Sequence, residues 1–194
     1  MVFSTPYFLF LYLPAVLLLY YISPLKLRNF VLLVFNLLFY GWGEPVYILL
    51  MIFSIVLDYS LGRWMHRLLE KEDRRGAKRV LVLSVVLNLA LLGFFKYTDF
   101  LIGSLNDLLG LGIRKLGLPL PIGISFYTFQ AMSYLIDLYR GSVPVQKSLV
   151  NFGTYVSLFP QLIAGPIVRM STVSEQLDNR KETSIFSPPA CGGL

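Results

Sequence analysis

The sequence predicts an all-α fold, a polytopic transmembrane helix bundle in which some helices are re-entrant or broken. Of its 194 residues, 56% are hydrophobic and only 14% are charged, whereas soluble domains carry roughly 25% charged residues. The charges are clustered, and long uncharged runs separate the clusters. This pattern indicates membrane-spanning helices. It excludes a secreted disulfide scaffold, a disordered chain and an ordinary cytosolic enzyme.

Four apolar runs in the first half of the chain predict four spans. The first contains Pro14, which predicts a kinked helix. It does not read as a signal peptide, because no Lys or Arg precedes it and no small-x-small cleavage site follows it. A tight turn is expected at Gly41–Pro45, with Tyr40, Trp42 and Tyr47 in an interfacial aromatic belt. The predicted spans are Phe8–Ile22, Phe30–Tyr40, Val46–Leu61 and Val80–Phe95.

These spans are short for a bilayer. About 16 residues at a rise of ~1.5 Å each reach about 24 Å, which is less than the ~30 Å of a typical hydrocarbon core. We therefore expect either that the ends extend by snorkelling or that the protein thins the bilayer.

Basic residues set the predicted orientation. The segment 63–79 carries seven Lys or Arg residues against three acidic ones, and the positive-inside rule predicts a cytoplasmic loop there. Lys26 and Arg28 then also lie inside, while Gly41–Pro45 and the N-terminus lie outside. The same rule accounts for the net charge of +6, so no nucleic-acid partner is expected.

Polar residues enter the apolar segments in the second half of the chain. Residues 97–118 have the pattern of an amphipathic helix, either interfacial or packed under the bundle. Two prolines and a glycine then precede a helix that reaches about residue 140, and its polar side must meet protein or a water-filled cavity. That side is either the wall of a substrate passage or a set of interhelical hydrogen bonds, and the spacing leaves both open. The polar positions that share this face are Tyr127, Gln130, Tyr134 and Asp137.

The last apolar segment, Leu149–Val168, contains two prolines, a glycine and a side-chain amide. At membrane depth this composition predicts a re-entrant or unwound segment that lines a cavity. Gln161 and Arg169 are therefore candidates to meet a polar ligand.

The single cysteine and the single histidine exclude several kinds of site. Cys191 alone can form neither an intramolecular disulfide nor a CxxC metal site. His66 alone cannot supply a zinc site with two or three imidazoles, and in its basic segment it is not expected to be catalytic. No metal site is expected. The charged pairs expected to be structural are Asp58–Arg63 and Asp137–Arg140.

Two stretches carry a resemblance to a known family. The stretch 118–141, LPLPIGISFYTFQAMSYLIDLYRG, and the stretch 158–169, LFPQLIAGPIVR, closely resemble successive blocks of the membrane-bound O-acyltransferase (MBOAT) family. The start of the chain and FYGWGEP at 39–45 are similar to its bacterial branch. Within that branch, we favour the type that acetylates exported polysaccharides such as alginate over the D-alanylating type.

The resemblance implies a partial MBOAT fold around a central tunnel in the bacterial inner membrane. An acyl group, expected to be acetyl, passes from a cytoplasmic donor to an extracytoplasmic polysaccharide acceptor. The donor is expected to be acyl-CoA or another acyl thioester, with no bound cofactor, and an extracytoplasmic acyltransferase partner finishes the transfer. The tunnel-lining candidates are Tyr127, Gln130, Tyr134, Asp137, Gln161 and Arg169.

Two features depart from the family. Its characteristic histidine lies well downstream of the 158–169 stretch, and His66, which precedes the signature, is not equivalent to it. No catalytic residue is therefore assigned, and these residues alone are expected to be inactive. The family pattern is lost near Thr183. We therefore expect 1–182 to be the N-terminal part of the membrane domain and 183–194 to be an aberrant or disordered tail, left by a gene fragment or a frameshift.

Three alternatives remain open. A transporter or channel module also uses proline-broken helices with buried polar groups, but it predicts inverted repeats, and the sequence shows none. A noncatalytic assembly subunit would bind an extracytoplasmic transferase without doing chemistry. A nonfunctional remnant would be degraded, because its unpaired polar faces are costly in lipid.

Overall fold

The computed structural model describes residues 6–25, 27–110, 112, 114, 116–117, 119–164 and 170. Over these residues the chain forms helices and no strand, which confirms the all-α prediction. The elements in chain order are η1 (Phe8–Tyr12, a π-helix), α1 (Leu13–Ile22), α2 (Arg28–Gly43), α3 (Ile48–Glu70), α4 (Arg74–Leu109), α5 (Ile124–Arg140), α6 (Leu149–Ser157) and α7 (Phe159–Ala164).

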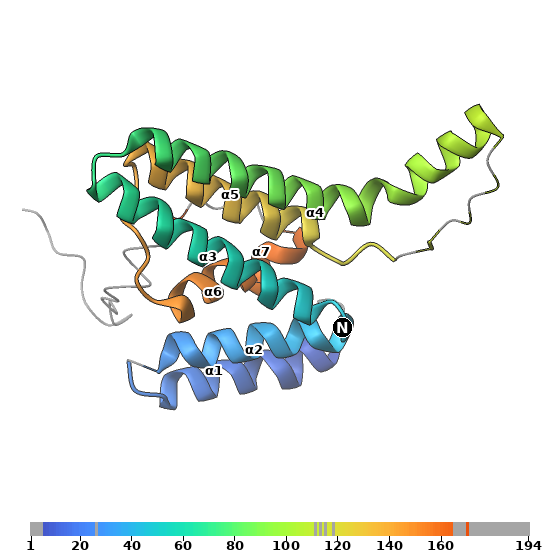
Figure 1. The fold of residues 1–194 in the computed structure, drawn as a ribbon. Helices are drawn as coiled ribbons and strands as arrows, with labels where there is room; N and C mark the ends of the chain where they lie inside the picture. The colour runs from blue at the N-terminus through green and yellow to red at the C-terminus, as the bar shows by residue number, and fades with distance from the viewer. Residues whose placement is uncertain are drawn as a thin grey trace, which may run out of the picture.

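The helices form a bundle in which α3 has the central place (Figure 1). It packs against α4, α5 and α6, while α2 packs against α6 and α1. The last part of α4 projects beyond the other helices (Figure 1). The main core lies where α3, α5 and α6 meet. Its fully buried side chains include Met51, Tyr127, Tyr134 and Phe152.

The first helix contains Pro14, and its opening turn is π-helical. The Leu13 N–H bonds to the Phe8 carbonyl, five residues earlier. Pro14 has no N–H to donate, and a single wider turn of this kind accommodates a gap in the hydrogen-bond ladder. Phe8 also packs its ring against Phe39 and Phe159, which joins this helix to α2 and α7.

The helices α3 and α4 are the two described helices that are long and apolar enough to cross a membrane; the helix Phe8–Ile22 is apolar but shorter. The protein buries only 39% and 22% of their most apolar stretches, so much apolar surface faces outward. They contain 23 and 36 residues, and at ~1.5 Å per residue they reach about 34 and 54 Å. Both exceed a ~30 Å hydrocarbon core because they continue beyond the predicted apolar spans into charged or polar segments. The shortness of the apolar spans themselves stays a prediction.

The prediction of a loop over residues 63–79 is also wrong. α3 continues to Glu70 and α4 begins at Arg74, so only Lys71–Asp73 connects them. Arg, Leu, Met, Lys and Glu are strong helix formers. A charged segment that follows an apolar span can therefore leave the bilayer and still remain helical.

Side chains support this helical connection from both sides. On α3, His66 Nε2 and Glu70 Oε1 lie 3.2 Å apart, one turn from each other. On α4, Asp73 caps the first turn by accepting a hydrogen bond from the Gly76 N–H at 2.9 Å. The basic residues therefore gather on two helix ends and not on a flexible loop.

The turn predicted at Gly41–Pro45 begins later than expected. α2 runs through Gly43 and stops at Glu44. The residue before a proline is disfavoured in the helical conformation, and Pro45 itself has no N–H to donate. Tyr40 is buried and not interfacial, whereas Trp42 is exposed as an aromatic belt requires.

The separate amphipathic helix predicted at 97–118 is absent from the described residues. α4 continues to Leu109 and ends at Gly110, which has a left-handed conformation with φ +64°. The leucines of this last part are exposed, so the segment is not packed under the described bundle. They are Leu101, Leu105, Leu108 and Leu109.

A buried polar contact joins α3 to α4. Asn88 Nδ2 donates to Asp58 Oδ1 at 2.6 Å, and the Ser84 hydroxyl lies 3.4 Å from the same oxygen. All three side chains are buried. The predicted ion pair of Asp58 with Arg63 is therefore wrong, because the carboxyl group points across to α4 and finds its donors there.

The expected boundary between the membrane domain, 1–182, and the tail, 183–194, lies outside the described residues.

Candidate functional site

The candidate site is the polar face of α5. This helix follows Gly123, which has φ +77°, and a Cβ there would lie 2.9 Å from Leu162 Cγ and 3.0 Å from the Leu162 carbonyl oxygen. Only glycine allows α5 and α7 to approach this closely. At its other end, the Ser142 N–H bonds back to the Asp137 carbonyl while Gly141 turns the chain with φ +75°. Both ends of the helix are thus fixed.

The four residues that spacing placed on one face of this helix are all buried, which confirms the shared face. α5 packs against α3, α4, α6 and α7, so the polar side chains meet the protein interior, as the bilayer requires. Their exposed fractions range from 1% to 8%. They are Tyr127, Gln130, Tyr134 and Asp137.

The structure brings Gln130 and Gln161 together. Gln130 Nε2 donates to Gln161 Oε1 at 2.9 Å and to the Tyr155 carbonyl oxygen at 2.8 Å. The helical segment predicted to be broken does break: α6 ends at Ser157 and α7 starts at Phe159. This break places the Gln161 amide beside α5.

Tyr134 and Asp137 lie further along the same face. The Tyr134 hydroxyl accepts a hydrogen bond from the Gln146 N–H at 2.9 Å, so it holds the segment that leads into α6. Asp137 is buried and Arg140 is exposed. The predicted ion pair between them is not formed in the described part of the chain, where the carboxyl group is buried and the guanidinium group is exposed.

One tunnel-lining candidate remains, and the histidine that was not expected to be catalytic lies away from this face. Arg169 lies outside the described residues. His66 is on α3, where it pairs with Glu70. No group of three His, Cys, Asp or Glu side chains that could hold a metal ion lies together in the ranges that the structure describes.

Sequence reasoning missed a cluster of buried hydroxyls beside Tyr127. The Ser54 hydroxyl of α3 faces the Tyr127 hydroxyl without the geometry of a full hydrogen bond, and Tyr40 of α2 lies close enough to Tyr127 to interact electrostatically. The hydroxyl cluster comprises Tyr40, Ser54 and Tyr127, all 1–4% exposed.

None of these three hydroxyl oxygens, nor that of Thr128 on the same helix as Tyr127, has a hydrogen-bond partner among the described residues. Buried polar groups are nearly always bonded, to protein or to ordered water. A cluster left without partners is therefore suited to bind a polar ligand or water. In the sequence, Ser54 and Thr128 stand out as small polar residues within apolar runs. No feature of the sequence predicted that Tyr40 would be buried.

Tyr155 of α6 was missed as well. Its carbonyl accepts from Gln130, and its hydroxyl lies near the Ser133 and Gln130 side chains. The buried polar side chains around α5 therefore form two groups. One contains amides and lies toward α6 and α7, and the other contains hydroxyls and lies toward α2 and α3.

Comparisons with known proteins identify relatives along almost the whole chain. It is 42% identical over 187 residues to the probable alginate O-acetylase of Pseudomonas aeruginosa, an alignment that covers 94% of the chain and 36% of the relative. It is 41% identical to the probable alginate O-acetylase of Azotobacter vinelandii, with 94% and 37% covered. It is also 31% identical to the peptidoglycan O-acetyltransferase of Helicobacter pylori, with 93% and 39% covered.

No model of a known protein family and no solved structure matches the chain. The chain spans little more than a third of the length of the curated relatives that it matches. The two long apolar helices and these relatives together indicate a membrane protein. Over almost all of its length, the chain is homologous to the alginate O-acetylases and to a peptidoglycan O-acetyltransferase.

Proposed function

We propose that this chain forms part of a membrane O-acetyltransferase that passes an acetyl group to an exported polysaccharide. The observation that carries the proposal is the identity of 42% and 31% to an alginate O-acetylase and a peptidoglycan O-acetyltransferase, along 94% and 93% of the chain. Both relatives are named for transfer of an acetyl group to oxygen on a polymer that contains sugars.

The polar interior of α5 supports this chemistry. In acetyl transfer from a thioester, an acceptor hydroxyl oxygen bonds to the carbonyl carbon, the carbon–sulfur bond breaks, and the hydroxyl proton goes by way of a base to the leaving thiolate. Positioned donors stabilise the charge that develops on the carbonyl oxygen. The hydroxyls of Ser54 and Tyr127 are buried donors without other partners among the described residues. We propose that this face, with the Gln130–Gln161 pair, lines the passage.

We propose acyl-CoA or another acyl thioester as the donor, and an extracytoplasmic acyltransferase as a partner. The surroundings would be the bacterial inner membrane, with the N-terminus outside and the α3–α4 connection in the cytoplasm. The support for this orientation is the concentration of Lys and Arg at that connection, which the positive-inside rule assigns to the cytoplasmic side.

We further propose that these 194 residues transfer no acetyl group by themselves. Removing the acceptor's proton needs a base, whose contribution is commonly about 10²–10⁴-fold in rate. The one histidine of the chain, His66, is on α3 and pairs with Glu70, not on the polar face of α5.

A chimera tests both proposals. The 187 homologous residues of the Pseudomonas aeruginosa relative are replaced by those of this chain, and ester-linked acetate on alginate is measured in cells that lack the relative. We expect the chimera to restore acetylation and this chain alone to leave the alginate unacetylated.

Membrane levels of each protein are measured by immunoblot as a control. A chimera that reaches the membrane in normal amounts but adds no acetate contradicts the proposed function. Acetylation by this chain alone contradicts the proposal that it is inactive without further sequence.

A further inference from the structure

A hollow of about 600 Å³ follows the outer side of α4 near its start. Its lining residues are spaced three and four apart, which is the spacing of a single stripe along a helix. Cations form the first part of this stripe and aliphatic side chains form the second. The stripe consists of Arg75, Lys78, Arg79, Val82, Leu83 and Val86.

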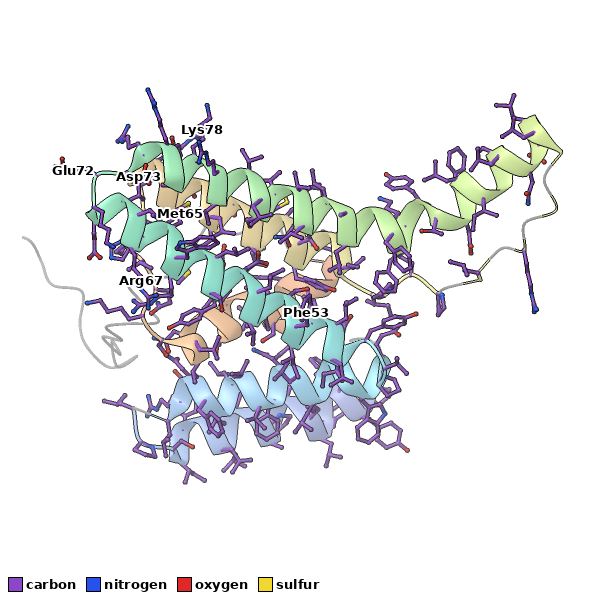
Figure 2. The ribbon with its side chains drawn as sticks, in the orientation of Figure 1. Phe53, Met65, Arg67, Glu72, Asp73 and Lys78 are labelled. Carbon is purple, nitrogen blue, oxygen red and sulfur yellow. The ribbon has the colours of Figure 1, made fainter. Side chains whose placement is uncertain are left out.

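This outer stripe faces away from the rest of the bundle. The inward side of α4 is buried and includes Val80, Ser84 and Asn88. On the outward side, 53% of Val82 and 56% of Val86 are exposed. Figure 2 shows Lys78 on the side of α4 away from the other helices. No described helix covers the stripe.

The charges of the stripe have one sign. Arg75, Lys78 and Arg79 are exposed. Among the described residues, no acidic side chain lines the hollow and none pairs with these cations. The aliphatic part begins one turn further along a helix that is long enough to span a bilayer. From Arg79 to Val86 the helix rises about 10 Å.

We propose that this stripe binds an anionic phospholipid. The phosphate lies between Arg75, Lys78 and Arg79, and an acyl chain follows Val82, Leu83 and Val86. The order of charge and then hydrocarbon along the helix matches the order of headgroup and chain in a bilayer, and three cations complement a negative headgroup. This site is independent of acetyl transfer.

Fluorescence quenching by lipid tests the proposal. The probe is the full chain with Val86→Trp, after the two native tryptophans are removed by Trp42→Phe and Trp64→Phe. It is placed in vesicles of phosphatidylcholine that contain brominated phosphatidylglycerol or, separately, brominated phosphatidylcholine. Quenching of the Trp at position 86 gives the affinity of each brominated lipid for the stripe. We expect the affinity of phosphatidylglycerol to exceed that of phosphatidylcholine at least about fivefold, a factor that roughly one cation provides.

Two charge variants in the same background locate the effect. Replacing all three cations of the stripe, by Arg75→Gln, Lys78→Gln and Arg79→Gln together, should bring the ratio of anionic to neutral lipid binding close to one. Arg67→Gln with Lys71→Gln removes two exposed cations at the same end of the bundle but outside the hollow, and should leave the preference intact; Figure 2 shows Arg67 on α3.

Three results would overturn the proposal. Equal quenching by both lipids would mean that the stripe has no preference. Equal loss in both charge variants would mean that diffuse surface charge attracts the lipid. No quenching by either lipid would mean that protein, and not lipid, covers this side of α4.

Discussion

The α3–α4 contact and the interior of α5 both bury polar side chains inside apolar helices, but they differ in how those side chains are bonded. Between α3 and α4, Asn88 and Ser84 direct their donors at one oxygen of Asp58. In the hydroxyl cluster of Tyr40, Ser54 and Tyr127, none of the three hydroxyls has a hydrogen-bond partner in the described structure. The first arrangement is complete apart from Asp58 Oδ2, which also lacks a described partner.

This difference separates two uses of polarity within a membrane. A bonded polar group between helices contributes modestly to association, on average about 0.6 kcal/mol. An unbonded one costs free energy in the folded state, and it persists where a ligand, water or further protein completes it. The two regions should therefore respond in opposite ways when a polar group is removed.

The largest expected effect comes from the backbone beside the α5 site. Gly123→Ala places a methyl group 2.9 Å from Leu162 Cγ at a residue with φ +77°. We expect the free energy of unfolding to fall by about 3 kcal/mol, because a left-handed alanine is strained and α7 must move away from α5. Unfolding of the purified chain in mixed detergent micelles measures the loss.

Gly93→Ala on α4 is the matched control. A Cβ at Gly93 meets nothing within 4 Å, and alanine favours a helix over glycine by up to about 1 kcal/mol. This variant should be as stable as the parent or more so. If the two substitutions have equal effects, the close approach of α5 to α7 is not what holds this region.

The next effect tests the bonded region. Asn88→Leu removes the donor that lies 2.6 Å from Asp58 Oδ1 and leaves a buried carboxyl group poorly bonded. We expect a loss of about 2 kcal/mol in the free energy of unfolding. In the double variant Asp58→Leu with Asn88→Leu, much of this loss should return, because apolar side chains replace both partners. Additive losses in the double-mutant cycle would argue against this coupling.

The sequence was sufficient for features that repeat within one helix. The spacing of Tyr127, Gln130 and Tyr134 predicted a shared face of α5, and the structure buries all three. The prolines at positions 160 and 166 predicted a broken helix, and α6 ends at Ser157, just before the first of them. These features depend on local geometry, which residue order determines.

The sequence was insufficient where a partner comes from a distant helix. Asp58 was paired with the nearby Arg63, but its donors are on α4, 26 and 30 residues away. Tyr40 looked interfacial, but packing turns it into the hydroxyl cluster beside Tyr127. The charged segment 63–79 was predicted to be a loop. Its first residues have high helix propensity and instead extend α3 to Glu70.

A smaller effect is expected at a bonded hydroxyl of α5. Tyr134→Phe removes the acceptor of the Gln146 N–H without changing the ring. The buried N–H then lacks its partner, and we expect a loss of about 1 kcal/mol in the free energy of unfolding. The same micelle titration measures it. An unchanged stability would show that the Gln146 N–H finds another acceptor.

The smallest effect on stability is expected at Tyr127, which lies two helical turns before Tyr134 on the same face of α5. Tyr127→Phe removes the same atom from the same helix, but this hydroxyl has no partner among the described residues. The free energy of unfolding should therefore stay constant or rise by up to about 1 kcal/mol, because an unsatisfied buried group is lost. In the chimera with the Pseudomonas aeruginosa relative, however, alginate acetylation should fall about tenfold or more if this hydroxyl donates to the reacting carbonyl.

The two tyrosine variants sharpen the comparison because each removes one buried hydroxyl from α5, and only the Tyr134 hydroxyl has a hydrogen-bond partner among the described residues. A structural role for Tyr127 predicts lost stability with acetylation per folded protein unchanged. The proposed role predicts the reverse, stability kept and acetylation lost. Tyr134→Phe supplies an internal reference for lost stability alone, since its hydroxyl already has a structural partner in Gln146. If both variants lose stability equally and neither loses acetylation, the unpartnered hydroxyls belong to helix packing and the passage lies elsewhere.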